Sequence, residues 1–178
     1  ISRAPRLILD QPHLVKKVMF PLEILPWVSV LSGLAHLGIA LMLLILLGAW
    51  EQGIPQLTAI ALPFVWLALL PLCVGLSWLL SALGTYVRDV GQVLGMLLSL
   101  MMFLTPIFFP IDALPPAVRP WMVLNPLALT ISETRKVLVD GHWPDWSMLG
   151  MHLAACCAIA VFGAVFFRTA RRGFADVV

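Results

Sequence analysis

Charged side chains are scarce in this sequence of 178 residues. It holds 11 basic and 9 acidic residues, 11% of the total, against roughly 25% in an average soluble domain. So few charges cannot cover the surface of a domain of this size, which excludes an ordinary soluble protein. The net charge is only +2 and the basic residues form no stripe that could follow phosphates, so we expect no nucleic-acid partner.

Catalytic and nucleotide-binding motifs are missing from the sequence as well. It contains no GxxxxGK[ST] phosphate loop, no HExxH zinc motif and no GxSxG nucleophile turn. Its three cysteines, Cys73, Cys156 and Cys157, lie in apolar stretches without the spacing of a zinc site. We therefore expect no catalytic residue, metal or cofactor in this chain. It begins with Ile1 and without a signal-peptide pattern, so we also expect it to be N-terminally incomplete.

Long charge-free stretches are what the sequence has instead. Each can cross a bilayer, because about 22 residues in an α-helix cover about 33 Å of a ~30 Å hydrocarbon core. Helices are required there, since open strands would leave amides unpaired in lipid. The sequence thus predicts an all-α integral membrane protein, a single domain over 1–178, with four spans at about 27–50, 58–83, 91–111 and 146–167.

The distribution of basic residues predicts the orientation of these spans. Four spans place both ends of the chain on one side, together with the short turn at Arg88. That side carries eight of the 11 Lys and Arg residues, and the opposite side carries three. By the positive-inside rule, both ends are cytoplasmic and the protein is a multi-pass inner-membrane protein.

Two segments outside the spans are patterned, and prolines punctuate both. In the outer segment 112–145 they break any continuous span, which favours two short re-entrant helices at roughly 116–124 and 127–139. Asn125 is expected to cap the second of these helices, with Pro126 in its first position. In the inner segment 11–26, apolar residues recur at helical spacing. This inner helix either lies on anionic lipid or docks on a cytoplasmic partner.

Smaller signals lie within and between the spans. Pro71 interrupts the second span and should kink it. Gly91 and Gly95, one turn apart, suggest close helix packing. The adjacent pair Arg88 and Asp89 is either a solvated loop pair or part of an intracellular contact surface.

Five motifs follow one another in an order that resembles a known family. They are Leu14-Val-Lys-Lys-Val-Met-Phe-Pro-Leu-Glu-Ile-Leu-Pro26, Gly84-Thr-Tyr-Val-Arg-Asp-Val-Gly91, Thr105-Pro-Ile-Phe-Phe-Pro110, Leu124-Asn-Pro-Leu127 and Glu133-Thr-Arg135. The series is similar to the permease subunit of type 2 ATP-binding-cassette (ABC) exporters, in the branch that moves polysaccharides such as O-antigen, capsule or teichoic acid. The tail Arg171-Arg-Gly-Phe-Ala-Asp-Val177 is similar to the C-terminus of that branch.

The resemblance implies a six-span permease of which this chain holds the last four spans. It further implies two permease copies that pair with two separate nucleotide-binding ATPase subunits, which bind ATP and Mg. At matching positions it implies an ATPase-coupling role for Leu14, Lys16, Lys17, Phe20, Pro21, Glu23, Arg88 and Asp89. It implies an outer gate that contains Pro106, Pro110, Asn125, Pro126, Glu133 and Arg135.

A glycan substrate would need aromatic surfaces along the pathway and few fixed charges. Candidate contacts near the pathway ends are Tyr86, Phe103, Phe108, Phe109 and Trp121, although aromatic residues in membrane helices more often face lipid or neighbouring helices. Two other functions remain open: a type 2 ABC exporter of drugs or small lipids, and a membrane-embedded enzyme acting on lipid-linked sugars. The enzyme is disfavoured because the outer acidic residues lack the HExxH or DxD pattern of such chemistry: Asp112, Glu133, Asp140 and Asp145.

Overall fold

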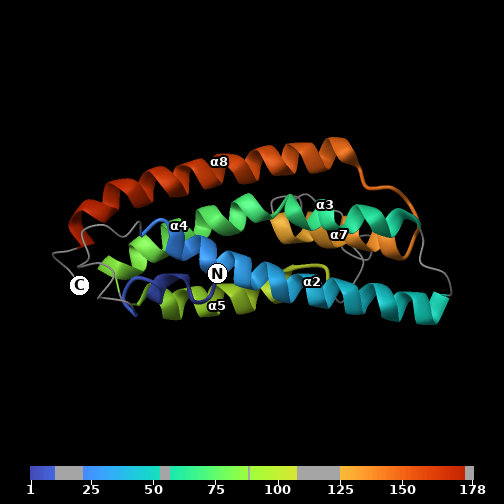
Figure 1. Ribbon diagram of the computed structural model, residues 1–178, viewed down its shortest axis with the longest axis horizontal. Helices are drawn as coiled ribbons and strands as arrows, with labels where there is room; N and C mark the ends of the chain where they lie inside the picture. Colours follow the sequence, from blue (N-terminus) through green and yellow to red (C-terminus); the bar gives the residue numbers. More distant parts are fainter. Residues whose placement is uncertain (11–21, 53–56, 88, 108–124, 175–178) are drawn as a thin grey trace. The chain divides into compact units, whose positions relative to one another are not determined.

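The computed structural model describes residues 1–10, 22–52, 57–87, 89–107 and 125–174. Every regular element in these ranges is helical, which confirms the predicted all-α fold (Figure 1). Four of the elements are short: the 3₁₀ helices η1 (Ala4–Arg6), η2 (Leu57–Ala61) and η4 (Arg171–Gly173), and the α-helix α3 (Leu62–Leu67). The longer α-helices are α2 (Ile24–Gln52), α4 (Leu70–Tyr86), α5 (Val90–Leu104), α7 (Pro126–Leu138) and α8 (Trp146–Ala170).

Among the described residues, three helical segments are long and apolar enough to cross a membrane. They are Ile24–Trp50, Leu57–Tyr86 and Trp146–Ala170, with 27, 30 and 25 residues. Helix α5 has 15 residues. At about 1.5 Å per residue it is shorter than a ~30 Å hydrocarbon core. The predicted third span, 91–111, extends past the end of α5: residues 105–107 form a turn, and the rest lie outside the described ranges. The count of four spans therefore stays a prediction.

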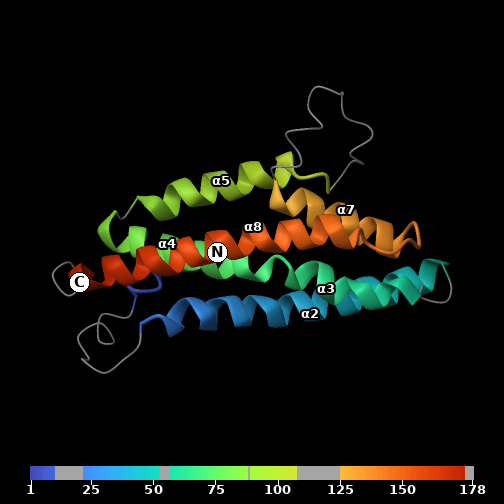
Figure 2. The same ribbon diagram turned by 90° about the horizontal axis from the view of Figure 1, so that it is seen from above.

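Large apolar side chains lie exposed along the long helices. On α2, for example, Leu43, Leu46 and Leu47 are all more than half exposed. A soluble protein rarely carries so extensive an apolar surface, whereas lipid tails cover it at no cost. Figure 2 shows α2 and α8 as long helices without a break along their length. Their composition and exposure are those of membrane-spanning helices.

The segment between Leu57 and Tyr86 is interrupted immediately before Pro71. Helix α3 ends at Leu67 and α4 begins at Leu70. In the intervening turn, the Leu69 N–H donates to the Trp66 carbonyl at 3.1 Å, three residues back instead of four. Because proline has no N–H and its ring crowds the preceding turn, a regular helix cannot run through this point. The sequence predicted a kink at Pro71, and the structure shows an interruption of the helix directly before it.

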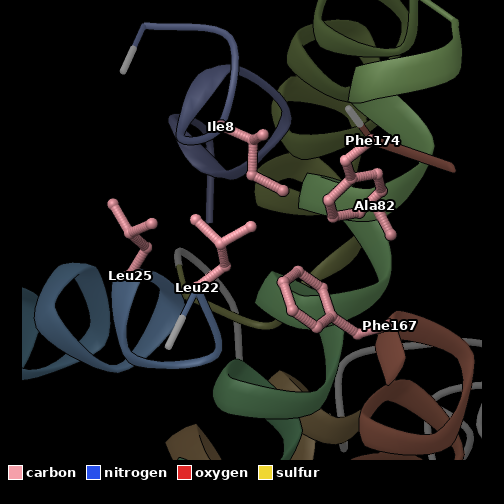
Figure 3. Packing of buried hydrophobic residues seen from close by; sticks show 6 residues of the cluster. All are labelled: Ile8, Leu22, Leu25, Ala82, Phe167 and Phe174. Carbon is pink, nitrogen blue, oxygen red and sulfur yellow. The ribbon is translucent and has the colours of Figure 1, made fainter. Parts of the chain in front are cut away.

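The chain divides into two compact units, which are described separately. Unit 1 comprises 1–35, 70–98 and 155–178, and unit 2 comprises 36–69 and 99–154. The core of unit 1 contains Ile8, Leu22, Leu25, Ala82, Phe167 and Phe174 (Figure 3). These residues come from the N-terminal segment, α2, α4, α8 and the residue after η4, so the core joins parts of the chain that are distant in sequence.

Backbones approach closely at two places in unit 1. Gly84 of α4 lies against η1, where an added Cβ would come within 2.6 Å of Pro5 Cα. Gly75 of α4 lies against α8, where an added Cβ would come within 2.6 Å of Ala160 Cα. Gly163 of α8 faces Gly75 in turn, since a Cβ there would lie 2.8 Å from the Gly75 carbonyl carbon. Small residues permit this kind of helix packing in membranes.

Gly91 and Gly95, near the start of the predicted third span, were expected to allow close packing against another helix. Within the described part of the chain, a Cβ added at Gly95 would meet nothing within 4 Å, and one at Gly91 would meet only the Pro5 side chain at 3.9 Å. Their spacing indicated a helix contact, but spacing alone does not specify which face of a helix another helix covers. The close contact between helices forms at Gly75 and Gly163 instead.

The core of unit 2 is built where η2 and α3 pack against α7. One cluster contains Ala61, Leu62 and Val137. A second contains Val65, Ala68 and Leu149, with Leu129 of α7 packed against it. Helix α7 therefore contributes side chains to both clusters, and α8 contributes Leu149 to the second.

Candidate functional site

The start of α7 is held by one side chain that makes two hydrogen bonds. Asn125 Oδ1 accepts from the Leu127 N–H at 3.0 Å, and Pro126 occupies the first turn of the helix. The predicted cap is therefore confirmed. Asn125 Nδ2 also donates to Thr105 Oγ1 at 3.1 Å, and the Thr105 hydroxyl donates to the Met101 carbonyl. Both side chains are buried, so the cap of α7 is tied to the end of α5.

The C-terminal half of α7 makes two hydrogen bonds to distant segments and one ion pair within the helix. The Thr58 hydroxyl of η2 donates to the Val137 carbonyl at 2.7 Å. An Arg135 guanidinium N–H donates to the Ile107 carbonyl at 3.3 Å. Glu133 is only 4% exposed and accepts from Lys136 Nζ at 2.6 Å. Helix α7 thus contacts the chain that follows α5 and the chain that precedes α3.

The residues expected to form an outer gate lie mostly on or beside α7. The helix contains Pro126, Glu133 and Arg135 and coincides with the second predicted re-entrant helix, 127–139. Pro106 is buried directly after Thr105. Pro110 and the first predicted re-entrant helix, 116–124, lie outside the described residues. That this region closes a pathway stays a prediction.

Most residues expected to couple to an ATPase lie outside the described ranges: Leu14, Lys16, Lys17, Phe20, Pro21 and Arg88. Of the remaining two, Asp89 directly precedes α5. Its carbonyl accepts from the N–H groups of Gln92 and Val93 in the first turn of that helix. Glu23 forms ion pairs with Arg171 at 3.3 Å and with Arg168 at 3.5 Å. Its carbonyl accepts from Trp78 Nε1 at 3.1 Å. Glu23, which directly precedes α2, is therefore joined to the end of α8 and to α4.

Two of the five candidate glycan contacts are described, and they differ in environment. Phe103 of α5 is 68% exposed. Tyr86 donates its hydroxyl to the Ala170 carbonyl at 2.7 Å, and its ring lies 5.9 Å from that of Phe174. Tyr86 therefore fastens the C-terminal tail to the end of α4. Phe108, Phe109 and Trp121 lie outside the described residues, and glycan contact stays a prediction for all five.

Some residues that hold these sites were not singled out from the sequence. Thr58 and Thr105 bind α7 from segments distant along the chain, and Gly75 and Gly163 set the contact between α4 and α8. A weak signal existed for the threonines, since Thr58 lies near the start of a charge-free stretch and Thr105 opens one of the five motifs. Among the described residues, no group of three or more His, Cys, Asp or Glu side chains could hold a metal ion.

The long apolar helices of this chain, with their exposed apolar faces, define an all-α, multi-pass membrane protein. The chain belongs to the ABC-2 type transporter family, whose pattern matches residues 1–139. The similarity to this family and to its polysaccharide-export branch, inferred above from five motifs, is confirmed.

Its relatives include proteins of glycan export. The chain is 28% identical over 174 residues to the O-antigen export system permease protein RfbA of Myxococcus xanthus, an alignment that covers 96% of this chain and 66% of the relative. It is 23% identical over 175 residues to an RfbA of Klebsiella pneumoniae, covering 93% and 64%. It is 24% identical over 134 residues to the polysialic acid transport protein KpsM of Escherichia coli, covering 74% and 52%. The chain thus spans just under two thirds of the length of the RfbA relatives.

Proposed function

We propose that this chain is part of the permease of an ABC exporter that moves a polysaccharide or lipid-linked glycan across the inner membrane. The observation that carries the proposal is its membership of the ABC-2 type transporter family together with relatives named for O-antigen export and polysialic acid transport. The permease works as a homodimer. It carries out no chemistry on its substrate and binds no cofactor, because a separate subunit hydrolyses ATP with Mg.

The coupling to the ATPase takes place at the cytoplasmic side. The excess of basic residues around both ends of the chain supports a cytoplasmic position for them. The segment 14–26 docks on the nucleotide-binding subunit and Arg88 with Asp89 makes a second contact. The ion pairs of Glu23 with Arg168 and Arg171 support this arrangement, since they join the described end of the segment to the end of a membrane-spanning helix.

Helix α7 is the gate helix on the outer face. Two properties support this role: its polar anchors reach segments distant in the chain, and it is too short to cross the bilayer, with 13 residues. Its buried hydrogen bonds hold the helix in a defined place, as a closed gate requires. Movement of the helix would open the pathway for the glycan.

Deletion of the gene in its own host tests the proposal directly. Surface polysaccharide should disappear from immunoblots of whole cells, and glycan should accumulate on the cytoplasmic side of the inner membrane. The full-length gene should restore export, and it should fail to do so when the partner ATPase carries a substitution of its phosphate-loop lysine.

Two results would contradict the proposal. Normal surface glycan combined with a new sensitivity to drugs would indicate a small-molecule exporter. Altered glycan structure with normal export would indicate an enzyme that acts on lipid-linked sugars.

A further inference from the structure

Glu133 is a buried carboxylate whose two oxygens have different partners. Oε1 accepts from Lys136 Nζ at 2.6 Å, one turn further along the same helix. Oε2 accepts from the backbone N–H of Asp145 at 2.9 Å, in the segment before α8. A carboxylate taken out of water needs such partners, because burial without them is strongly unfavourable. Of the two, only the bond to Asp145 leaves α7.

Asp145 is also the residue that caps α8. Its Oδ1 accepts from the N–H groups of Ser147 at 3.0 Å and Met148 at 3.2 Å. Its carbonyl accepts from the Leu149 N–H at 2.9 Å. Asp145 is therefore fixed to the first turn of α8 on one side and to Glu133 on the other. A displacement of α8 at this end therefore acts on α7 through this hydrogen bond, in addition to the apolar cluster that holds Leu149 of α8 and Leu129 of α7.

The connection between the two helices is folded back on the end of α7. The Val139 N–H donates to the Arg135 carbonyl at 2.8 Å, and the His142 N–H donates to the Lys136 carbonyl at 3.1 Å. Gly141 adopts a positive φ of 66°, a conformation that glycine takes at little cost. Backbone hydrogen bonds hold this turn to α7 as far as His142. Beyond it, the hydrogen bond from the Asp145 N–H to Glu133 holds the connection to α7 again.

We propose that Glu133 is a positioning residue that makes α7 and the first turn of α8 move as one body. The functional part of this inference rests on the proposed role of α7 as the gate helix. Opening the gate then requires the outer end of α8 to move together with α7, while the loop between them keeps its shape. The oxygen of Glu133 that accepts from the Asp145 N–H makes this connection, and the ion pair with Lys136 contributes less to it.

Three substitutions separate the two bonds of Glu133. Glu133→Gln keeps an oxygen that accepts from the Asp145 N–H but abolishes the ion pair. Lys136→Met abolishes the ion pair and leaves the acceptor oxygen toward Asp145, although it should lower overall stability because the buried carboxylate loses its charged partner. Glu133→Ala removes both bonds. If the bond to α8 matters, the first two variants resemble the wild type and the third does not, whereas a dominant ion pair would make all three alike.

Distances between spin labels measure directly how firmly α7 is connected to the first turn of α8. Labels are placed on α7 and α8 through Ser132→Cys and Met151→Cys in the purified full-length protein, after replacement of its other cysteines by alanine. The distance distribution between the labels should be narrow in the wild type, in Glu133→Gln and in Lys136→Met. Its width should roughly double in Glu133→Ala, because an element that loses its anchoring contact samples more positions.

A second measurement does not depend on any Glu133 variant. In the complex with the ATPase subunit, the distance between the labels should be the same without nucleotide and with Mg-ATP bound. A distance that changes between these states would overturn the proposal, and so would an unchanged width in Glu133→Ala. The widths are measured without the partner, so they test this connection even if the exported substrate is not a glycan.

Discussion

The close contact of α4 and α8 at Gly75 and Gly163 makes the strongest quantitative prediction. Replacing Gly163 by alanine places a Cβ 2.8 Å from the Gly75 carbonyl carbon and 3.0 Å from its Cα. Carbon atoms normally approach to about 3.5–4.0 Å. The neighbouring atoms belong to the backbone of α4, so no side-chain rotation can make room. The two helices must separate by roughly 1 Å, which weakens every contact along their interface.

The cost of this separation can be compared with a control on the same helix. Overpacking of a tight interface costs about 1–3 kcal/mol. Alanine otherwise favours a helix over glycine by about 1 kcal/mol, which offsets part of that cost. At Gly150, also in α8, an added Cβ meets nothing within 4 Å. Gly150→Ala should therefore be neutral or slightly stabilising, and the two variants should differ by about 2 kcal/mol in free energy of unfolding.

Reversible unfolding of the purified full-length protein in mixed detergent micelles provides the assay. Wild type, Gly163→Ala and Gly150→Ala are titrated in parallel, with tryptophan fluorescence as the signal. Gly75→Ala should behave like Gly163→Ala, because its added Cβ would meet the backbone of α8 at Ala160. Equal stability of Gly163→Ala and Gly150→Ala would show that the helices do not meet at these glycines, and the reasoning would fail.

Two further predictions concern the fastening of α7 and of the C-terminal tail. Asn125→Ala should destabilise the start of α7 by about 1 kcal/mol and raise amide hydrogen exchange there about fivefold. Asn125→Ser, which keeps a capping oxygen and adds no charge at this buried position, should raise exchange less. Equal exchange in the two variants would show that the loss of the cap is not the cause. Glu23→Arg should lower the melting temperature slightly at low salt, and adding Arg171→Glu should restore it. Because the Arg171 and Glu23 side chains are 47% and 32% exposed, water and salt screen the pair, so the effect should be at most about 1 kcal/mol and vanish at high salt. A salt-independent loss that the double swap does not restore would contradict an ion pair.

Several features of this protein follow from its sequence because they depend on neighbours within one or two turns. Charge-free stretches of this length are stable only as helices in a bilayer, so the all-α membrane class required no knowledge of packing. The cap at Asn125 is formed with the N–H two residues on, and the break before Pro71 follows from the missing N–H of proline. These local rules act in the same way whatever the rest of the chain does.

The partners of the polar and small residues were decided only by the tertiary structure. The sequence placed Glu133 in a motif but could not connect it to the Asp145 N–H, and it gave no sign that the Tyr86 hydroxyl binds the Ala170 carbonyl. It also pointed to a spaced glycine pair, whereas the contact forms at Gly75 and Gly163. In an almost uniformly apolar chain, hydrophobicity determines that helices form but barely distinguishes one helical face from another. Which faces meet depends on the fit of side chains from distant segments, and this fit exists only once the helices have packed.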